Sequence, residues 1–313
     1  MEFEHRPVLY REVLEKLNIK PEGIYVDGTL GGGGHSAGIL KALTTGKLIG
    51  IDQDEEALKA AEKKLSQISD GYQLIHGNFR EMDRLVREGG HPAVDGILLD
   101  IGVSSYQFDN EERGFSYRYN APLDMRMDQS QPTTARDLVN NYSEDELTKI
   151  LLQYGEERWA RRISKFIVER RAVAPIETTF DLVEVIQQAI PKAARRKGGH
   201  PAKKTFQALR IEVNGELEVL EEVIPKAVDL LKPGGRLAII TFHSLEDRRV
   251  KQAFRELYAD CICPPSQPVC TCNKVREIEI ITRKPILPSE EELKENRRAH
   301  SAKLRVAEKT QRE

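Results

Sequence analysis

Hydrophobic and polar positions alternate regularly over the first hundred residues. Short runs rich in β-branched residues predict buried strands at 24–27, 47–52, 72–77 and 94–100. Segments with apolar residues three or four positions apart predict helices at 6–20, 36–44, 55–67 and 80–88. Because strands and helices alternate and polar residues close the strands, this part of the chain is typical of an α/β fold with a doubly wound parallel sheet.

The alternation then stops for about a hundred residues. Residues 109–127 have a loop-like pattern, and helical periodicity dominates from 134 to 189. The α/β pattern resumes with a helix at 215–231, a strand at 236–242, a helix at 245–258 and candidate edge strands at 275–283 and 302–309. We therefore expect one α/β domain of residues 1–108 and 209–313, interrupted by an all-helical domain of residues 109–208. An insertion at the active edge of a sheet commonly holds or covers the substrate.

A glycine-rich turn follows the first strand. Five glycines lie within the seven positions from Gly28 to Gly34, between the acidic residue Asp27 and the predicted helix. Glycine lets the backbone approach a ligand and adopt positive φ at little cost. The alternative is a flexible loop without a ligand, in which four consecutive glycines would only lose conformational entropy on folding. The pattern favours a nucleotide-like ligand held against backbone amides.

Acidic residues narrow the class of ligand. Asp52 ends the second strand, eighteen residues after Gly34, where a carboxylate can accept both ribose hydroxyls of an adenosine-type cofactor. Ligands bind outside the carboxyl ends of parallel strands, where we expect Gly33, Asp52, Phe79 and Asp100 to converge. The spacing is not G-x-G-x-x-G, so NAD, FAD and S-adenosylmethionine all remain open.

Composition is that of an ordinary globular protein. The 313 residues are 39% hydrophobic and 31% charged, and the net charge is −2. No apolar run reaches the roughly twenty residues that span a bilayer, and the N-terminus lacks the apolar core of a signal peptide. We therefore expect a cytoplasmic protein that does not contact membranes. The net charge argues against a general nucleic-acid coating protein, but not against basic residues gathered on one face.

Basic residues gather in two segments of the helical insertion. The first is one predicted helix with Arg158, Arg161, Arg162, Lys165, Arg170 and Arg171. The second is 192–204, with Lys192, Arg195, Arg196, Lys197, Lys203 and Lys204 and no acid. Such runs are either solvated faces or phosphate-binding surfaces, and their place beside the predicted active edge favours the second about as much as the first.

The four cysteines lie within twelve residues. They form a C-x-C…C-x-C pattern of Cys261, Cys263, Cys270 and Cys272 among prolines. A reducing compartment argues against a disulfide framework. The pattern can chelate one zinc ion, although the spacing is tighter than the usual C-x-x-C; the alternative is a proline-stiffened loop with free thiols.

Several motifs together resemble one enzyme family along nearly the whole chain. They are DGTLGGGGHS (27–36), DIGVSS (100–105), RGFS (113–116), PLDMRM (122–127), TFQALRIEVN (205–214), FHSLEDR (242–248) and SAKLRV (301–306). This order of motifs resembles the MraW/RsmH family of S-adenosylmethionine-dependent methyltransferases, which methylate the exocyclic N4 of a cytosine (position 1402) in 16S rRNA near the decoding site.

The resemblance carries expectations about fold, cofactor and site. It implies a Rossmann-like class I methyltransferase sheet, S-adenosyl-L-methionine as cofactor, and 16S rRNA or the small ribosomal subunit as partner. The cofactor contacts it implies are Gly33, Gly34, His35, Asp52, Phe79, Asp100 and Gln107. Tyr106 departs from the proline expected there, which affects the loop around Gln107. The sequence leaves the oligomeric state open, a homodimer included.

The chemistry of methyl transfer points to further candidates. The enzyme must align nucleophile, methyl group and sulfur, so positioning carries most of the catalysis. Asp100 and Ser104 are candidates to accept an N4 hydrogen of cytosine, although Asp100 can instead serve only the cofactor. Tyr106, Phe108, Phe115 and Tyr117 can stack on an extruded base or pack the insertion. His243 is a candidate proton acceptor or a structural histidine.

The absence of a nearby thiol also discriminates between acceptor atoms. Methylation at cytosine C5 needs a cysteine nucleophile, and none lies near Asp100 or the 241–244 strand end. The pattern therefore favours a nitrogen or oxygen acceptor. The rival classes are an NAD-dependent oxidoreductase, which nicotinamide fluorescence would reveal, and a non-catalytic RNA-binding factor, which labelled methyl transfer to rRNA would exclude.

Overall fold

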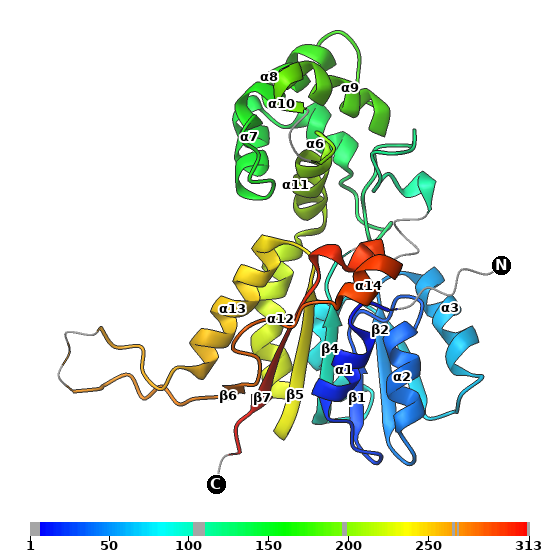
Figure 1. The fold of residues 1–313 in the computed structure, drawn as a ribbon, viewed down its shortest axis with the longest axis vertical. Helices are drawn as coiled ribbons and strands as arrows, with labels where there is room; N and C mark the ends of the chain where they lie inside the picture. Colours follow the sequence, from blue (N-terminus) through cyan, green and yellow to red (C-terminus); the bar gives the residue numbers. More distant parts are fainter. Residues whose placement is uncertain (1–6, 103–109, 196–198, 265–266, 268, 312–313) are drawn as a thin grey trace. The chain divides into compact units, whose positions relative to one another are not determined.

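The computed structural model describes residues 7–102, 110–195, 199–264, 267 and 269–311 (Figure 1). The chain divides into two compact units. The first comprises Met1–Gly102 with Leu217–Glu313, and the second comprises Val103–Glu216. The sequence pattern had suggested boundaries at 109 and 208, inside the range of the second unit. Within the described part of the chain, none of the helices is long and apolar enough to cross a membrane.

The first unit is built around a seven-stranded sheet in the order β3-β2-β1-β4-β5-β7-β6. Strands β1 to β5 pair in parallel, whereas β7 pairs antiparallel with both β5 and β6. The strands are β1 (Ile24–Asp27), β2 (Lys47–Asp52), β3 (Tyr72–His76), β4 (Val94–Asp100), β5 (Leu231–Thr241), β6 (Ile278–Ile280) and β7 (Lys303–Lys309). The expected fold class, a doubly wound Rossmann-like sheet of class I methyltransferase type, is confirmed.

Helices complete the first unit. They are α1 (Tyr10–Leu17), α2 (Gly34–Ala42), α3 (Glu55–Leu65), η1 (Phe79–Glu81), α4 (Met82–Glu88), α12 (Glu216–Leu230), α13 (Ser244–Tyr258), α14 (Glu290–Glu295) and η3 (Arg297–Ser301). Glu216, the first residue of α12, is grouped with the second unit. The strands predicted at 24–27, 47–52 and 94–100 have those bounds, and the edge strand expected at 275–283 is shorter, at Ile278–Ile280.

Alternation along the strands supplies a hydrophobic layer on each face of the sheet. Along β4, Ile97 and Leu99 belong to one buried cluster and Leu98 to the other, because successive side chains point to opposite faces. The first cluster includes residues of α4, α12 and α13, and the second includes residues of α1, α2 and α3. Both faces are therefore covered, as a parallel sheet requires.

The strand order fixes where a ligand can bind. The chain starts at β1, runs outward through β2 to β3, and returns to β4 on the other side of β1. The carboxyl ends of β1 and β4 therefore flank the topological switch point, where open α/β sheets form their ligand crevice. Asp27 and Asp100 are the last residues of these two strands.

The second unit is helical. Its helices are η2 (Glu111–Arg113), α6 (Ala135–Asn141), α7 (Glu144–Gln153), α8 (Ala160–Arg171), α9 (Thr179–Ala189), α10 (Lys192–Arg195) and α11 (Lys203–Asn214). Capping boxes start three of them: Thr134 with Asp137, Ser143 with Glu146, and Thr178 with Asp181. In each box a side-chain oxygen accepts from a backbone N–H that the helix itself leaves unpaired.

Candidate functional site

The loop between β1 and α2 is anchored and not a free linker. The Gly28 N–H donates to the Leu98 carbonyl of β4 at 2.9 Å. Gly31 and Gly33 have φ of 49° and 71°, in the left-handed region that glycine adopts without strain. A Cβ at Gly33 would also come within 3.2 Å of the Ala61 Cβ. The glycines thus allow the backbone conformation that this loop adopts at the switch point.

Asp52 is tied directly to the glycine loop. Its Oδ2 accepts from the Gly31 N–H at 2.8 Å, and its Oδ1 accepts from the Asp54 N–H at 2.9 Å. Burial raises the pKa of Asp52 above its usual value, although these amide hydrogen bonds oppose the shift. Each carboxylate oxygen keeps a second lone pair, so Asp52 can still accept hydroxyl hydrogen bonds from a ligand.

Asp27 is a site residue that sequence reasoning left without a role. Its Oδ2 accepts from the Ser36 hydroxyl at 2.7 Å, and its Oδ1 accepts from the Thr29 N–H at 3.2 Å. These bonds lock the end of β1 to the first turn of α2. Burial raises the pKa of Asp27 to about 6. The signal in the sequence was an acidic residue inside an otherwise apolar run, nine positions before a serine.

Asp100, at the end of β4, is a strongly perturbed carboxyl group of the crevice. Its N–H donates to the Thr29 hydroxyl at 2.6 Å, which fixes the end of β4 against the glycine loop. Its Oδ1 is buried and has no hydrogen-bond partner among the described residues. The pKa of Asp100 is raised to about 8, mainly by burial and to a smaller extent by the nearby negative charges of Asp27 and Glu246. The arrangement favours a cationic or hydrogen-donating ligand at this oxygen.

The first turn of α2 supplies the next two predicted residues. Gly34 begins the helix, and a Cβ there would lie 2.5 Å from the Pro7 Cγ. His35 is buried, with its Nε2 3.7 Å from the Asp100 Oδ2 and its ring nearly parallel to that of Tyr10. The structure therefore brings His35 and Asp100 together, as their expected common role requires.

Phe79 begins η1 directly after β3, and it is partly buried against the core. Its Cβ lies 3.4 Å from the position that a Cβ on Gly28 would occupy. Phe79 thus lies beside the glycine loop. Gln107 falls outside the described residues, as do Ser104, Tyr106 and Phe108.

His243 has an observed structural role. Its side chain accepts from the Glu246 N–H at 3.3 Å and caps α13, while the Glu246 carboxylate accepts from the N–H groups of Phe242 and His243. The His243 Nε2 lies 2.8 Å from the Glu246 Oε1. This buried glutamate also raises the pKa of Asp100, which no local sequence pattern indicated.

The predicted basic residues of the second unit differ in their surroundings. Arg170 and Arg171 donate to backbone carbonyls of that unit, as do Arg195 and Lys204. Arg158, Arg161, Arg162 and Lys165 of the α8 region are exposed. Arg196 and Lys197 fall outside the described residues.

A basic and aromatic hollow lies within the second unit. It has a volume of about 630 Å³ and is lined by Tyr117, Arg118, Gly199, His200 and Lys203. The rings of Tyr117 and His200 stack with centroids 4.3 Å apart and an interplanar angle of 7°. Phe115, by contrast, is buried. Of the described aromatic candidates, only Tyr117 therefore lies at a surface where a base can stack.

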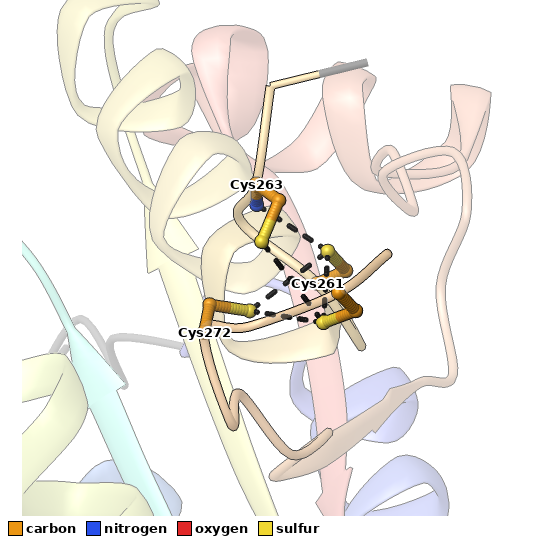
Figure 2. A group of neighbouring side chains, drawn as sticks. Cys261, Cys263 and Cys272 are labelled. Atoms are coloured by element: carbon orange, nitrogen blue, oxygen red, sulfur yellow. Dashed lines mark hydrogen bonds between the residues drawn. The ribbon is translucent and has the colours of Figure 1, made fainter. Parts of the chain in front are cut away.

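The cysteines lie elsewhere in the first unit. Cys261, Cys263, Cys270 and Cys272 occupy the loop between α13 and β6, with their sulfur atoms turned toward one another (Figure 2). Helix α13 begins just after the carboxyl end of β5 and runs back along the sheet for about 22 Å at 1.5 Å per residue. The loop after it is therefore remote from the crevice at the strand ends.

Comparison with known proteins identifies the family. A model of the MraW methylase family matches residues 2–310. The chain belongs to the MraW methylase family. It is 58% identical over 311 residues to "Ribosomal RNA small subunit methyltransferase H" of Heliobacterium mobile, covering 99% of this chain and 100% of the relative. The protein of the same name from Clostridioides difficile (strain 630) is 56% identical over 310 residues, covering 99% and 100%. The resemblance found in the sequence motifs is confirmed.

Family membership makes this protein a methyltransferase that uses S-adenosylmethionine. The residues of the crevice fit that cofactor. The Asp100 Oδ1 offers a buried acceptor for a cationic ligand, and Asp52 offers acceptors for hydroxyl groups. A Cβ added at Gly32 would have no atom within 4 Å, so the backbone borders open space at this position. A sulfonium cofactor with an adenosine moiety needs these features.

Proposed function

We propose that this protein transfers a methyl group from S-adenosylmethionine to the exocyclic N4 of a cytosine in 16S rRNA of the small ribosomal subunit, near the decoding site. The small-subunit rRNA substrate is supported by the names of relatives that match over nearly the entire chain. The observation that best supports S-adenosylmethionine as the methyl donor is the buried Asp100 Oδ1 at the switch point. Together with the nearby carboxyl groups of Asp27 and Glu246, it favours a cationic ligand.

We assign the following roles to the crevice residues. Asp52 accepts the ribose hydroxyls, while Gly33, Gly34 and Phe79 border the cofactor beside it. His35 lies beside Asp100 and borders the same end of the cofactor, and Gln107 keeps the cofactor contact that the family resemblance implies. When bound, the cofactor supplies an electrophilic methyl group. The chain's own task is to align it and to place the Asp100 carboxyl where a bound cation favours its ionised form.

Asp100 has two distinct candidate roles. We assign it to the cofactor, and acceptance of an N4 hydrogen is a second proposal that uses the same oxygen. A pKa of about 8 suits a group that exchanges a proton near neutral pH. Loss of cofactor affinity in Asp100→Asn supports the first role, whereas a fall in kcat with unchanged affinity supports the second.

The positions of the cysteines favour nitrogen over carbon as the acceptor. Methylation at C5 of cytosine proceeds through attack of a thiolate on C6. All four cysteines of the chain lie in the loop between α13 and β6, remote from Asp100. An exocyclic amine needs no covalent step and relies on orientation, which agrees with the side chains present in the crevice.

The helical unit is the proposed RNA-binding surface. Arg118 and Lys203 place positive charge at the hollow that Tyr117 and His200 line. Cations that contact phosphates position the RNA, and an aromatic ring stacks on an unpaired base. Arg158, Arg161, Arg162 and Lys165 extend the exposed positive charge of the same unit.

Labelled methyl transfer tests the proposal. Small subunits from cells that lack this protein are incubated with methyl-labelled cofactor, and fragments of the 16S rRNA are analysed by mass. We expect one methylated fragment, containing cytosine 1402, and much less of it with Asp52→Ala at a cofactor concentration near the Kd of the natural protein. Transfer to the large-subunit rRNA alone, or no transfer to either, would contradict the proposed substrate.

A further inference from the structure

Four cysteine sulfurs converge in the loop between α13 and β6, and Figure 2 labels three of these residues, Cys261, Cys263 and Cys272. The Cys261 and Cys270 sulfurs are 3.5 Å apart, and those of Cys270 and Cys272 are also 3.5 Å apart. Cys261 and Cys272 are separated by 3.8 Å, and Cys263 and Cys270 by 4.0 Å. All four sulfurs lie within 4.8 Å of one another. The two C-x-C pairs are therefore brought together as one cluster.

These separations match a tetrahedral metal site. Four sulfurs held 2.3 Å from a zinc ion at the corners of a tetrahedron are about 3.8 Å apart, by simple geometry. A disulfide would instead join two sulfurs at about 2.05 Å, well below each of the separations given above. The observed distances are close to the edge of the tetrahedron for pairs both within and between the two C-x-C segments.

Backbone amides add a second feature of thiolate sites. The Ile262 N–H donates to the Cys272 sulfur at 3.4 Å, and the Cys263 N–H donates to the Cys261 sulfur at 3.3 Å. Such hydrogen bonds orient metal-bound sulfur and stabilise its negative charge. The first of them also crosses from one C-x-C segment to the other.

The base of the loop is held firmly to the sheet domain. The Arg276 guanidinium donates to both carboxylate oxygens of Asp260, at 2.6 and 3.1 Å, across the two ends of the loop. The Glu277 N–H donates to the Leu257 carbonyl at 2.9 Å. These contacts hold the two ends of the loop, which carry Cys261 and Cys272, next to each other.

Beyond the base, the described residues of the loop form no hydrophobic core. Its apolar side chains Ile262 and Val269 are 68% and 69% exposed, and Val275 is exposed as well. Small segments without a core of their own are commonly held by a structural metal. The four sulfurs occupy the place where such a core would otherwise be.

We propose that Cys261, Cys263, Cys270 and Cys272 bind one structural zinc ion. Four thiolates fill the coordination shell and leave no open position, which is the arrangement of structural rather than catalytic zinc. On binding, the thiol protons leave to solvent and four Zn–S bonds form, with no change of oxidation state. The ion closes the loop on its base, at a distance from the methyl-transfer crevice.

Metal analysis of the full chain tests the site. Protein purified under reducing conditions without chelator should contain about one zinc per chain. The Cys263→Ser/Cys270→Ser variant should retain less than about a tenth of it. Gln267→Ala/Thr271→Ala removes a side-chain hydrogen bond in the same loop without touching a sulfur, and it should keep the zinc. Equal zinc contents in the two variants would overturn the proposal.

A second measurement uses the unmodified chain, so it does not depend on the folding of a variant. Metal-stripped, reduced protein is titrated with cobalt(II). We expect absorption bands of tetrahedral cobalt with sulfur-to-metal charge transfer, saturating at about one equivalent and abolished by added zinc. Hydrogen exchange of residues 260–276 should slow on adding zinc. Absence of the cobalt bands, or a different ion such as iron at full occupancy in the purified protein, would overturn the assignment.

Discussion

Replacing Asp100 with asparagine should stabilise the cofactor-free protein while weakening its binding of the cofactor. The folded chain holds the pKa of this carboxyl at about 8, against an ordinary value of 3.8. Between those two pH values the unfolded chain ionises first and binds fewer protons, so the free energy of unfolding falls as the pH rises. Asparagine is neutral throughout and removes this cost.

The size of the gain follows from the shift and the exposure of the side chain. At pH 7 the pH is roughly three units above the pKa of Asp100 in the unfolded chain. At 1.36 kcal/mol per unit, keeping this carboxyl neutral costs the folded chain at most about 4 kcal/mol. The Asp100 side chain is 26% exposed, so water recovers part of that cost. We expect a gain of roughly 1–3 kcal/mol, or a rise in Tm of roughly 2–10 °C. The gain should disappear near pH 4, where the carboxyl is protonated in the folded chain.

Thermal unfolding from pH 4 to pH 8, with and without S-adenosylmethionine, provides the assay. The cofactor should raise the Tm of the natural protein much more than that of Asp100→Asn. Asp95→Asn is the matched control at the opposite end of β4. Although burial alone would raise the pKa of Asp95, hydrogen bonds from Lys232 and the Ile24 N–H lower it, so this variant should lose stability at pH 7. A Tm for Asp100→Asn at or below the natural value at pH 8 would refute the reasoning.

Two further predictions concern the two ligands. Asp52→Ala should weaken cofactor binding by roughly 1.5–3 kcal/mol, the scale of a charge-assisted hydrogen bond, and unchanged affinity by calorimetry would remove Asp52 from the site. Arg118→Ala/Lys203→Ala should weaken binding of rRNA and reduce its salt dependence by roughly one to two units of slope, with cofactor affinity unchanged. The guanidinium of Arg136 is paired with Glu177, so Arg136→Ala should leave that slope near the natural value. Equal slopes for the natural protein and both variants would indicate that the hollow is an ordinary solvated surface.

Much of the sheet could be predicted because its signal is local. Strands β1, β2 and β4 are short apolar runs, and each ends in an aspartate at the carboxyl edge of the sheet. The start of β5 was misjudged. The strand was expected at 236–242, whereas it begins at Leu231, and its pairing with β4 shifts register between Val94 and Gly96. An irregularity of this kind depends on the neighbouring strand and is invisible in the sequence.

The electrostatics of the site could not be predicted, because they arise from residues far apart in the chain. The pKa of Asp100 depends on its burial, on Asp27 in β1 and on Glu246 in α13. In the sequence, Asp27 is an ordinary strand end, because its hydrogen bond with Ser36 depends on the fold. The convergence of the four cysteines was suggested by their spacing, but the interatomic distances come only from the fold.

The identity of the methylated atom tests the central claim most directly. Small subunits carrying cytosine labelled with tritium at C5 are methylated, and the product RNA is digested to nucleosides and then to bases. We predict that the tritium is retained and that the methyl group is found on the base, in a nucleoside distinct from 5-methylcytidine. Stoichiometric release of tritium to water would indicate attack at C6 and methylation at C5, and a methyl group on the ribose would indicate 2′-O transfer; either result would contradict N4 as the acceptor.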